Sequence, residues 1–478
     1  MNLSAQILLA APELALLLLA STLLVVDTLS RDPRKQLTYW LAQASLALVI
    51  VLCIANFPAE SVTAFHGHFV SDGLGAALKA IIAGIAIAVF FYSWDYLQEH
   101  GLMRGEFFVL GLFAVLGAMV MSSAGSLLTV FLGLELLSLS LYAMVAMHRE
   151  SSIASEAAMK YFVLGALASG MLLYGMSMLY GVTGTLELGA LSAAVAGGGA
   201  PGLLLSFGLV FVIVGIAFKL GAVPFHMWVP DVYEGSPTAV TLFISTAPKV
   251  AAFAMAIRLL VDGLAPLSAE WAGMLVILSV LSMAAGNLIA IAQSNIKRML
   301  AYSTIAHVGF LLLGILAARP AGYASAMFYV IVYALMTLGA FGVVILLSRA
   351  GFEADRLDDY AGLARRSPWF AFVMLIMMFS LAGVPPFVGF WGKWFVFKEA
   401  IAAGYVWLAL VAVVFSVIGA YYYLRVVKLM YFDEPAATEP VRSTGGLKAV
   451  LSLNGLAVLI LGLAPGVLMA LCLRAFPG

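Results

Sequence analysis

The chain has 478 residues, of which 64% are hydrophobic and 10% charged, and its formal net charge is zero. Soluble domains carry about 25% charged residues, so this composition excludes a set of soluble domains and favours lipid as the solvent. The neutral charge balance gives no indication of a nucleic-acid partner. The two cysteines, Cys53 and Cys472, lie in apolar runs and are too few for an iron–sulfur cluster, which usually needs four thiolates.

Apolar runs long enough to span a bilayer recur along the whole chain. A hydrocarbon core about 30 Å thick requires roughly 20 apolar residues per helix. The first run lacks a basic segment before it and a cleavage site after it, so we expect a membrane helix and not a signal peptide. Fourteen spans are predicted, at residues 8–26, 38–57, 74–94, 107–123, 127–147, 161–182, 203–223, 238–260, 272–292, 300–318, 324–348, 369–388 (with a possible extension over 391–401), 405–431 and 449–472.

Basic residues gather in alternate loops between these spans. The odd-numbered loops hold Arg31, Arg34, Lys35, Arg104, Arg149, Lys160, Lys297, Arg298, Arg349, Arg356, Arg365, Arg366, Arg425, Lys428, Arg442 and Lys448. The even-numbered loops and the C-terminal tail hold only Arg258, Arg319 and Arg474. The positive-inside rule then predicts cytoplasmic odd loops and places both termini on the periplasmic side.

Ionisable residues also lie within the apolar runs: Glu13, Lys79, Glu135, Lys219, Lys249, His307, Lys393 and Lys398. A charge at mid-bilayer costs at least about 2.5–3.5 kcal/mol on insertion scales, and such groups usually face a polar interior. Glu13 is close to a helix start, so we expect it to reach the outer interface. Lys79 and Lys398 fit either a buried side chain or one that extends to the surface. Glu135, Lys219 and Lys249 lie deeper and are predicted to act in charge transfer.

The histidines leave simpler interpretations open. His307 fits either a charge-relay group or a core histidine with satisfied hydrogen bonds. His66 and His68 form a His-x-His pair in an outer loop. A metal site there is not favoured, because a stable site needs further ligands and the neighbouring sequence offers none.

Residues 218–238, FKLGAVPFHMWVPDVYEGSPT, indicate a broken membrane helix. Pro224 and Pro230 cannot donate backbone hydrogen bonds, and proline ends or kinks a helix. At membrane depth the freed backbone groups are tolerated only where protein or water satisfies them. Lys219 is therefore expected beside a break, close to hydrated backbone.

A second stretch, FSLAGVPPFVGFWGKW at residues 379–394, resembles the first. Phe218, Leu220, Val223 and Pro224 recur 161 residues later as Phe379, Leu381, Val384 and Pro385. Paired interruptions in two halves of a transporter point to an ion path. The breaks are five helices apart, so the two copies would have opposite orientations. Ser380 occupies the place of Lys219 in the second copy, and the nearest lysine there is Lys393.

Glu135, Lys219, Lys249, His307 and Lys393 thus put one ionisable group on each of five membrane segments. Burial lowers the proton affinity of an amine, and a nearby carboxylate raises it again. A lysine whose acid partner moves can therefore take up and release protons, which is the requirement for a switched proton relay.

These motifs resemble those of the subunit N family of bacterial proton-pumping NADH–quinone oxidoreductase, respiratory complex I. The resemblance covers nearly the whole chain, and its most specific parts are the segment 218–238, NIKRMLAYSTIAHVGF at 295–310 and GFWGKW at 389–394. Related subunits of this complex and of multi-subunit cation/proton antiporters share the fold but usually lack Tyr-Glu-Gly-Ser-Pro after Trp-x-Pro-Asp. The chain also ends just after the fourteenth predicted helix, without the long lateral helix typical of subunit L.

The resemblance implies a role for each matching residue. Glu135 is similar to the glutamate of helix five, Lys219 to the central lysine of broken helix seven, Lys249 to the connecting lysine of helix eight, and Lys393 to the outward-leading lysine of broken helix twelve. His226, His307 and Lys160 fall on family positions with weaker roles. Lys79 and Glu13 match no functional position of the family.

The family implies an all-α integral membrane fold of about 14 helices with two inverted five-helix repeats. The expected parts are helices 1–3 at 1–106, the first repeat at 107–260, the second repeat at 272–431 and the last helix at 449–472. No flavin, cluster or NADH is expected on this chain, which agrees with the lack of a glycine-rich nucleotide motif after a strand. FMN and iron–sulfur clusters are expected in partner subunits.

The resemblance therefore implies a proton-translocating, non-redox membrane-arm subunit of a translocase in the bacterial inner membrane. Its partners would be the other membrane-arm and peripheral-arm subunits. A component of a multi-subunit cation/proton antiporter remains an alternative, because it would share every buried charge. A membrane subunit of a hydrogenase-type or ferredoxin-linked complex is a second alternative, and copurifying subunits would separate the three.

Overall fold

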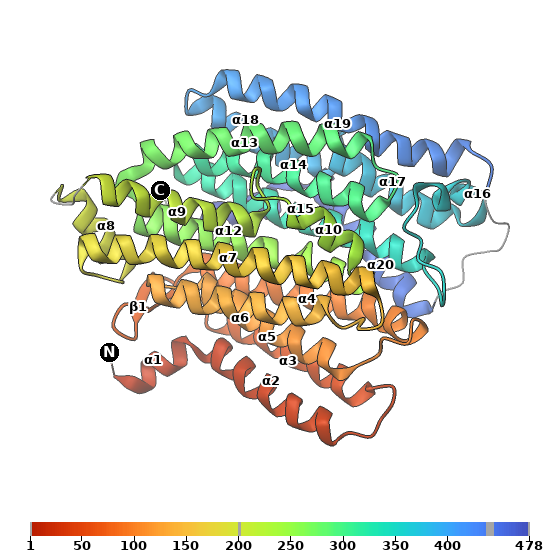
Figure 1. Cartoon of the computed structure of the whole chain (residues 1–478), viewed down its shortest axis with the longest axis horizontal. Helices are drawn as coiled ribbons and strands as arrows, with labels where there is room; N and C mark the ends of the chain where they lie inside the picture. Colours follow the sequence, from red (N-terminus) through yellow and green to blue (C-terminus); the bar gives the residue numbers. More distant parts are fainter. Residues whose placement is uncertain (1, 199–201, 436–443, 477–478) are drawn as a thin grey trace.

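A computed structural model describes residues 2–198, 202–435 and 444–476. These residues form a bundle of long helices, with one small sheet at one end (Figure 1). Within the described ranges, 13 helical stretches are long and apolar enough to cross a membrane. The predicted all-α membrane fold is therefore confirmed. Arg442, counted above among the odd-loop residues, lies outside the described residues.

The first three spans form one side of the bundle. The elements are α1 (Leu3–Leu9), α2 (Ala11–Leu29), α3 (Gln36–Ala55), β1 (Val62–Ala64), β2 (Phe69–Ser71) and α4 (Gly73–Glu99). The two strands pair antiparallel. The Asp72 side chain caps α4 by accepting a hydrogen bond from the Gly75 amide at 2.7 Å, which satisfies one of the free amides at the helix start.

The middle of the chain adds five further spans, and serine side chains cap two of their helices, at Ser126 and Ser151. The elements are α5 (Gly105–Ser122), α6 (Leu127–Val145), α7 (Ser152–Thr183), α8 (Leu188–Ala196), α9 (Gly202–Leu220), α10 (Trp228–Gly235), α11 (Thr238–Ile244), α12 (Ala247–Ile257) and the π-helical turn η1 (Arg258–Gly263).

The last part of the chain includes the helices farthest from α2 and α3, which are α18 and α19 (Figure 1), and two helices that contact α4, which are α15 and α20. The elements are η2 (Ala265–Leu267), α13 (Ser268–Ile291), α14 (Ile296–Leu316), α15 (Pro320–Leu347), η3 (Leu357–Tyr360), α16 (Leu363–Arg366), α17 (Pro368–Ala382), α18 (Val388–Ala402), α19 (Val406–Phe432), α20 (Gly445–Leu463) and α21 (Pro465–Arg474).

Loops of the same parity contact each other. This is expected, because an even number of membrane crossings separates them and puts them on the same side of the bundle. On the even side, the Val70 amide donates to the Ser123 carbonyl at 2.8 Å, and the Leu127 amide donates to Leu186 at 2.9 Å. On the odd side, the Ile296 amide donates to the backbone carbonyl of Asp355 at 2.7 Å, and the Gly362 amide donates to the backbone carbonyl of Leu429 at 3.0 Å. The alternation predicted from the basic residues is present in the structure.

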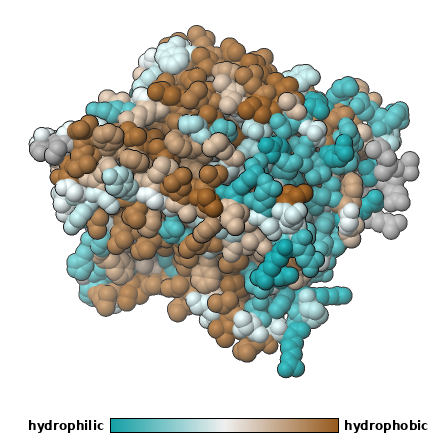
Figure 2. All heavy atoms as spheres, in the orientation of Figure 1, coloured by the Kyte–Doolittle hydropathy of each residue, from teal (hydrophilic) through white to brown (hydrophobic). Residues whose placement is uncertain are grey.

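Both ends of the described chain lie on the even side. The Gln6 side chain accepts a hydrogen bond from the Phe65 amide at 2.7 Å, and the Arg474 carbonyl lies beside Gly73. Figure 2 shows hydrophilic residues gathered toward the opposite end, where α16 lies, and apolar residues over much of the remaining face.

The two predicted helix breaks are present. Helix α9 ends at Leu220 and α10 begins at Trp228, while α17 ends at Ala382 and α18 begins at Val388. Each first half is followed by a glycine with positive φ, Gly221 at +85° and Gly383 at +89°. A left-handed residue after the last turn is the usual end of a helix, and glycine adopts it without a steric cost.

Two further interruptions were not predicted. The segment 238–260, expected as one helix, breaks between Ile244 and Ala247. The segment 449–472, also expected as one helix, divides at Ala464. Pro248 and Pro465 lie in the first turns of the second halves. A proline lacks the amide that would continue the preceding helix, so each marks a new helix start.

The contact between α13 and α14 depends on a glycine. A Cβ atom at Gly286 would lie 2.5 Å from the Ala306 amide nitrogen and 2.8 Å from the Tyr302 carbonyl oxygen. The two helix backbones therefore approach too closely for any side chain at this position. The same contact sets the position of α13 relative to α14 beside His307, the residue after Ala306.

Gly286→Ala is expected to destabilise the protein by about 1–3 kcal/mol, because backbone atoms must move to accept the methyl group. The measurement is the thermal denaturation midpoint of the purified protein in detergent. Gly273→Ala is the control on the same helix, since its Cβ meets no atom within 4 Å. An unchanged midpoint for Gly286→Ala would contradict the close contact.

Candidate functional site

Lys219, in the last turn of α9, reaches across to α6. Its amine donates to the Ser138 hydroxyl at 2.6 Å, and Ser138 lies three residues after Glu135 on the same helix. In the described structure Lys219 and Glu135 form no direct ion pair, and Glu135 Oε1 is buried without a hydrogen-bond partner. The aromatic ring of Tyr142 lies 5.8 Å from the Lys219 amine. The amine thus faces the protein interior, one helical turn from the carboxylate.

Lys249 is the third residue of α12 and is only 3% exposed. Its amine donates to the carbonyl of Leu220, the last residue of α9, at 2.8 Å. The break after Leu220 leaves this carbonyl without an intrahelical partner, and the C-terminal end of a helix carries partial negative charge. The ring of Trp228, the first residue of α10, lies 5.1 Å from the amine. The broken helix therefore supplies the acceptor for the lysine.

Small cavities lie on both sides of Lys249. The first cavity has a volume of about 20 Å³ and is lined by Lys219, Lys249, Ser138, Tyr161 and Trp228. The other is lined by Lys249, His307, Thr304, Tyr329 and Tyr333 and offers about 10 Å³. A single water needs roughly 10–15 Å³ on this measure. The first cavity therefore has room for about one water molecule, and the second is at the lower limit.

His307 is hydrogen-bonded at both ring nitrogens. Its Nδ1 lies 2.7 Å from the Tyr329 hydroxyl and its Nε2 lies 3.1 Å from the Tyr423 hydroxyl. The Tyr423 hydroxyl also shares a hydrogen bond of 2.5 Å with Ser303. One ring nitrogen must donate and the other accept in the neutral imidazole. The histidine is thus satisfied and also connected to further exchangeable protons.

Lys393, on α18, repeats the arrangement of Lys249. Its amine donates to the carbonyl of Ala382, the last residue of α17, and to the Ser416 hydroxyl, both at 2.8 Å. The neighbouring Gly392 packs against the ring of Tyr329, to which its Cβ would come within 3.2 Å. Tyr329 therefore lies between His307 and the Lys393 segment.

The structure brings five of the predicted residues into one row across the bundle. Its members in order are Glu135, Ser138, Lys219, the first cavity, Lys249, the second cavity, His307, Tyr329 and Lys393. The hydroxyl residues Tyr329, Tyr423 and Ser416 were not predicted. Their only signal in the sequence is a hydroxyl group inside an apolar run, which Ser138 shares.

Lys160 and His226 lie outside this row. Lys160 is 43% exposed and pairs with Glu156 and Asp231, both at 2.8 Å. Asp231 also pairs with Arg298, so Lys160 belongs to a surface network on the odd-loop side. His226 lies in the turn between α9 and α10, with a buried Nδ1 that has no hydrogen-bond partner.

The expectation for Glu13 needs correction, and of the two alternatives for Lys79 the structure shows the buried one. The Lys79 amine lies 2.8 Å from Glu13 Oε1, and the two residues are 4% and 6% exposed. Glu13 therefore does not extend to the outer interface, because a cation on the neighbouring helix α4 compensates its buried charge. The Lys398 side chain, in contrast, is 67% exposed.

No group of three or more potential metal ligands occurs in the part of the chain that the structure describes. His68 uses its Nδ1 in a 2.8 Å hydrogen bond with Ser126. It connects the loop before α4 to the start of α6.

Comparison with known proteins agrees with this geometry. Residues 124–419 match the profile of a family described as NADH:quinone oxidoreductase/Mrp antiporter, TM. A protein of Thiobacillus denitrificans named NADH-quinone oxidoreductase subunit N is 58% identical over 466 residues, which cover 98% of this chain and 96% of that protein.

Among solved structures, a chain of respiratory complex I from Thermus thermophilus with bound aureothin is 34% identical, with a TM-score of 0.82 and coverage of 96% and 98% of the two chains. A chain of the Mrp complex from Dietzia sp. DQ12-45-1b has a TM-score of 0.88 at 22% identity, over 98% and 97% of the two chains, which shows a shared fold. With the profile match over more than half of its length and relatives of this similarity, the chain belongs to the NADH:quinone oxidoreductase/Mrp antiporter family of transmembrane subunits.

Proposed function

We propose that this chain is a proton-translocating membrane-arm subunit of an NADH–quinone oxidoreductase in the bacterial inner membrane. The observation that supports this most is the row of buried groups, in which Lys249 faces a water-sized cavity on either side. Redox chemistry would take place in partner subunits that hold FMN and iron–sulfur clusters. The chain itself would move protons as a non-redox part of the translocase.

The lysines of the row are held by uncharged acceptors, which suits a relay. Lys219 donates to a serine hydroxyl, and Lys249 donates to a backbone carbonyl. Two neighbouring ammonium groups repel each other strongly in a low-dielectric interior. A proton that arrives at Lys219 would therefore favour release of the proton from Lys249 into the second cavity, on the side of His307. Movement of Lys219 toward or away from Glu135 would set when this happens.

The row would continue outward through His307 and Lys393. Each ring nitrogen of His307 already has a hydroxyl partner, so a proton taken up at one nitrogen can be balanced by a proton lost at the other. The Ser416 hydroxyl bound to Lys393 then offers the next acceptor on α19. We infer that proton release to the periplasm begins there.

The first helix break supports the proposal of partner subunits. Pro224 is exposed and Met227 is 65% exposed, although both lie in the interruption between the membrane segments α9 and α10. Irregular backbone at membrane depth is tolerated only where protein or water covers it. A neighbouring membrane-arm subunit would provide this cover. At the second break Pro385 and Pro386 are exposed as well, although the Trp391 indole just beyond the break donates to the Gly462 carbonyl of α20 at 2.8 Å.

The two breaks also support the inverted repeats at 107–260 and 272–431. In each repeat a half-helix ends at a glycine of positive φ, and a lysine amine donates to the carbonyl of its last residue. The lysines come from different elements, α12 and α18. The repeats would therefore share an acceptor position and differ in which helix supplies the cation.

A cation/proton antiporter subunit is the second candidate. The likeness to the Mrp chain, at 22% identity, carries the fold and not the activity. Relatives named subunit N at more than 50% identity favour the oxidoreductase. Sodium-driven proton exchange by the purified protein would favour the antiporter instead.

Lys219→Ala is expected to lower proton pumping and NADH–quinone turnover together, by about tenfold or more. The substitution removes the amine and leaves Glu135 without a cation to meet, and a coupled pump cannot turn over without moving protons. Both rates can be measured in inverted membrane vesicles with equal amounts of assembled complex. Lys398→Ala is the matched control, since that side chain is exposed. Full pumping by Lys219→Ala would contradict the relay.

Lys393→Ala should weaken pumping more than Lys393→Arg. Arginine keeps a cation beside the Ala382 carbonyl and Ser416, but it hardly releases its proton. The ratio of protons moved to NADH oxidised, measured in the same vesicles, reports the effect. Wild-type ratios in the alanine variant would place proton release elsewhere in the bundle.

Both termini are predicted to face the periplasm. In a background lacking Cys53 and Cys472, a cysteine at exposed Ser4 should react with a membrane-impermeant maleimide in intact cells. A cysteine at exposed Glu150, in an odd loop, should react only after the membrane is opened. The reverse pattern would overturn the proposed orientation.

A further inference from the structure

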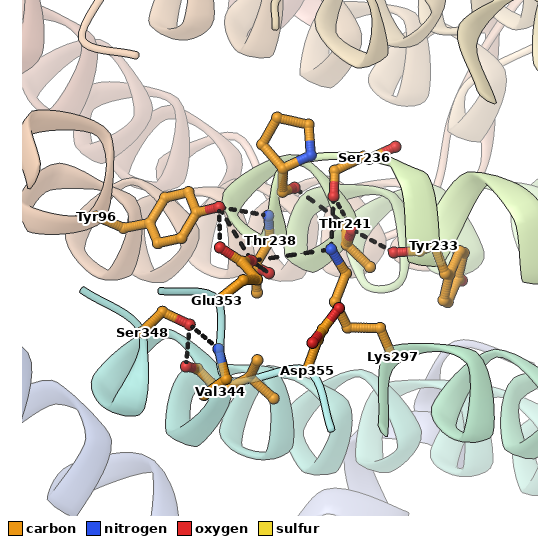
Figure 3. A network of polar contacts seen from close by, with 12 residues as sticks. Tyr96, Tyr233, Ser236, Thr238, Thr241, Lys297, Val344, Ser348, Glu353 and Asp355 are labelled. Atoms are coloured by element: carbon orange, nitrogen blue, oxygen red, sulfur yellow. Dashed lines mark hydrogen bonds and ion pairs between the residues drawn. The ribbon is translucent and has the colours of Figure 1, made fainter. Parts of the chain in front are cut away.

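A second polar cluster lies at the odd-loop end of the bundle, around Glu353 in the connection between α15 and η3. The Tyr96 hydroxyl donates to both carboxylate oxygens of Glu353, at 3.1 and 3.0 Å, and the Thr238 hydroxyl donates to Oε1. Figure 3 shows the carboxylate between Tyr96 of α4 and Lys297 of α14. The cluster thus joins the N-terminal helices to both halves of the remaining bundle.

Lys297 lies on the inner side of this carboxylate. Its amine is 3.9 Å from Glu353 Oε1 and donates to the Ser236 carbonyl at 2.7 Å. The Lys297 side chain is 3% exposed, whereas the Glu353 side chain is 27% exposed. The carboxylate can therefore exchange protons with water outside, while the lysine is sealed within the protein.

Other titratable groups surround the pair, and of these Tyr96 and Tyr360 are buried. His100 Nε2 lies 3.4 Å from Glu353 Oε2, and the His100 ring stacks on Tyr96. Asp355 and Glu234 also act electrostatically on Lys297, and Glu353 and Asp355 act on Tyr360. Lys297 is thus the one cation of this set that is turned inward, and the acidic groups surround its outer side.

Hydroxyl groups continue inward from Lys297. The Tyr233 hydroxyl is buried and makes no hydrogen bond of standard geometry, and its nearest hydroxyl neighbours are Thr304 and Tyr333. Thr304 and Tyr333 share a hydrogen bond of 2.6 Å, and both line the cavity that also contains Lys249 and His307. Thr304 is seven residues after Lys297 on α14, a rise of about 10 Å. Polar groups therefore lie both around Lys297, near the surface end of α14, and seven residues further along this helix at the central cavity.

We propose that Glu353 and Lys297 form the site at which protons from the odd-loop side enter the relay, with Tyr233, Thr304 and Tyr333 leading to Lys249. This inference rests on the proposed function and names the uptake groups for it. The Glu353 carboxylate takes a proton from water and passes it to the neutral Lys297 amine, which becomes an ammonium. Each hydroxyl then accepts one proton and gives up its own, so that Lys249 gains a proton and the line returns to its starting state.

Anchoring of the loop alone does not account for this arrangement. The connection is already held by the Ala354 amide, which donates to Ser348 at 3.1 Å, and by the Tyr360 hydroxyl, which donates to the Ala354 carbonyl at 3.0 Å. A carboxylate that only held the loop in place would need neither the buried Lys297 beside it nor the buried Tyr233 hydroxyl further inside. A buried polar group without a partner is costly, which is consistent with a role for Tyr233 when a proton or water passes.

The test uses the assembled complex in inverted vesicles, with Glu353→Gln. The amide can still accept from Tyr96 and Thr238, but it cannot carry a proton. Coupled turnover should be close to the parent near pH 6 and should fall increasingly above neutral pH, by up to about tenfold per pH unit where direct protonation from water limits the rate. Added formate, a small mobile acid, should restore part of the lost rate. Glu353→Asp should keep most of it.

Asp358→Asn, which changes an exposed carboxylate in the adjoining η3, should match the parent at every pH. A loss for Glu353→Gln that does not vary with pH and does not respond to formate would assign a structural role and overturn the proposal. Parent-like turnover across the pH range would also overturn it. If Glu353→Gln does not assemble, Lys297→Gln takes its place with the same expected pH-dependent loss and the same overturning results.

Glu135→Gln, measured alongside, separates this proposal from the proposed function. A strong loss at every pH in Glu135→Gln, with parent-like Glu353→Gln, would leave the relay in place and move proton uptake elsewhere. Full pumping by Glu135→Gln would count against the proposed function itself, whatever the Glu353 variants do.

Discussion

The structure depends on how backbone carbonyls are satisfied where membrane helices break. A helix that ends at membrane depth leaves its last carbonyls without partners and without bulk water to replace them. In this chain a buried lysine amine supplies the missing donor twice, at Leu220 and at Ala382. The break and the cation compensate each other, because the carbonyl at the negative end of a helix stabilises the ammonium that it binds. Neither would be tolerated alone at this depth.

The same constraint sets the spacing of the lysines in the proposed proton relay. Half-helix ends position Lys219, Lys249 and Lys393, and none of the three has a carboxylate within ion-pair distance in the described part of the chain. Hydroxyl groups and two water-sized cavities occupy the intervals. Such small cavities keep the dielectric low, so that neighbouring charges influence each other over longer distances than in water. A change of protonation at one lysine therefore changes the proton affinity of the next.

Much of this could be predicted from the sequence because the signals are local. Runs of apolar residues, Pro224 with its neighbours, and charges inside those runs were sufficient for the spans, the two breaks and the five ionisable residues that the structure brings into one buried row. Contacts between helices could not be predicted in this way. Ser138 stands between Lys219 and Glu135 only because α9 crosses α6 at that height. The break before Lys249 was missed because Ser245, Thr246 and Pro248 interrupt the apolar segment too briefly to separate it into two spans. The Glu13–Lys79 pair joins residues 66 positions apart in the sequence.

The comparison of Lys79 with the relay lysines shows why burial alone does not identify function. Lys79 and Lys249 are similarly buried, at 4% and 3% exposure. The Lys79 amine, however, has a carboxylate at 2.8 Å, and separating such a pair would leave an uncompensated charge in the membrane. Lys249 is held by a carbonyl, which accepts a hydrogen bond from an ammonium or from a neutral amine. Proton release therefore costs Lys249 much less than it costs Lys79. The partner of a buried lysine, and not its depth, distinguishes a structural ion pair from a group that can pass protons.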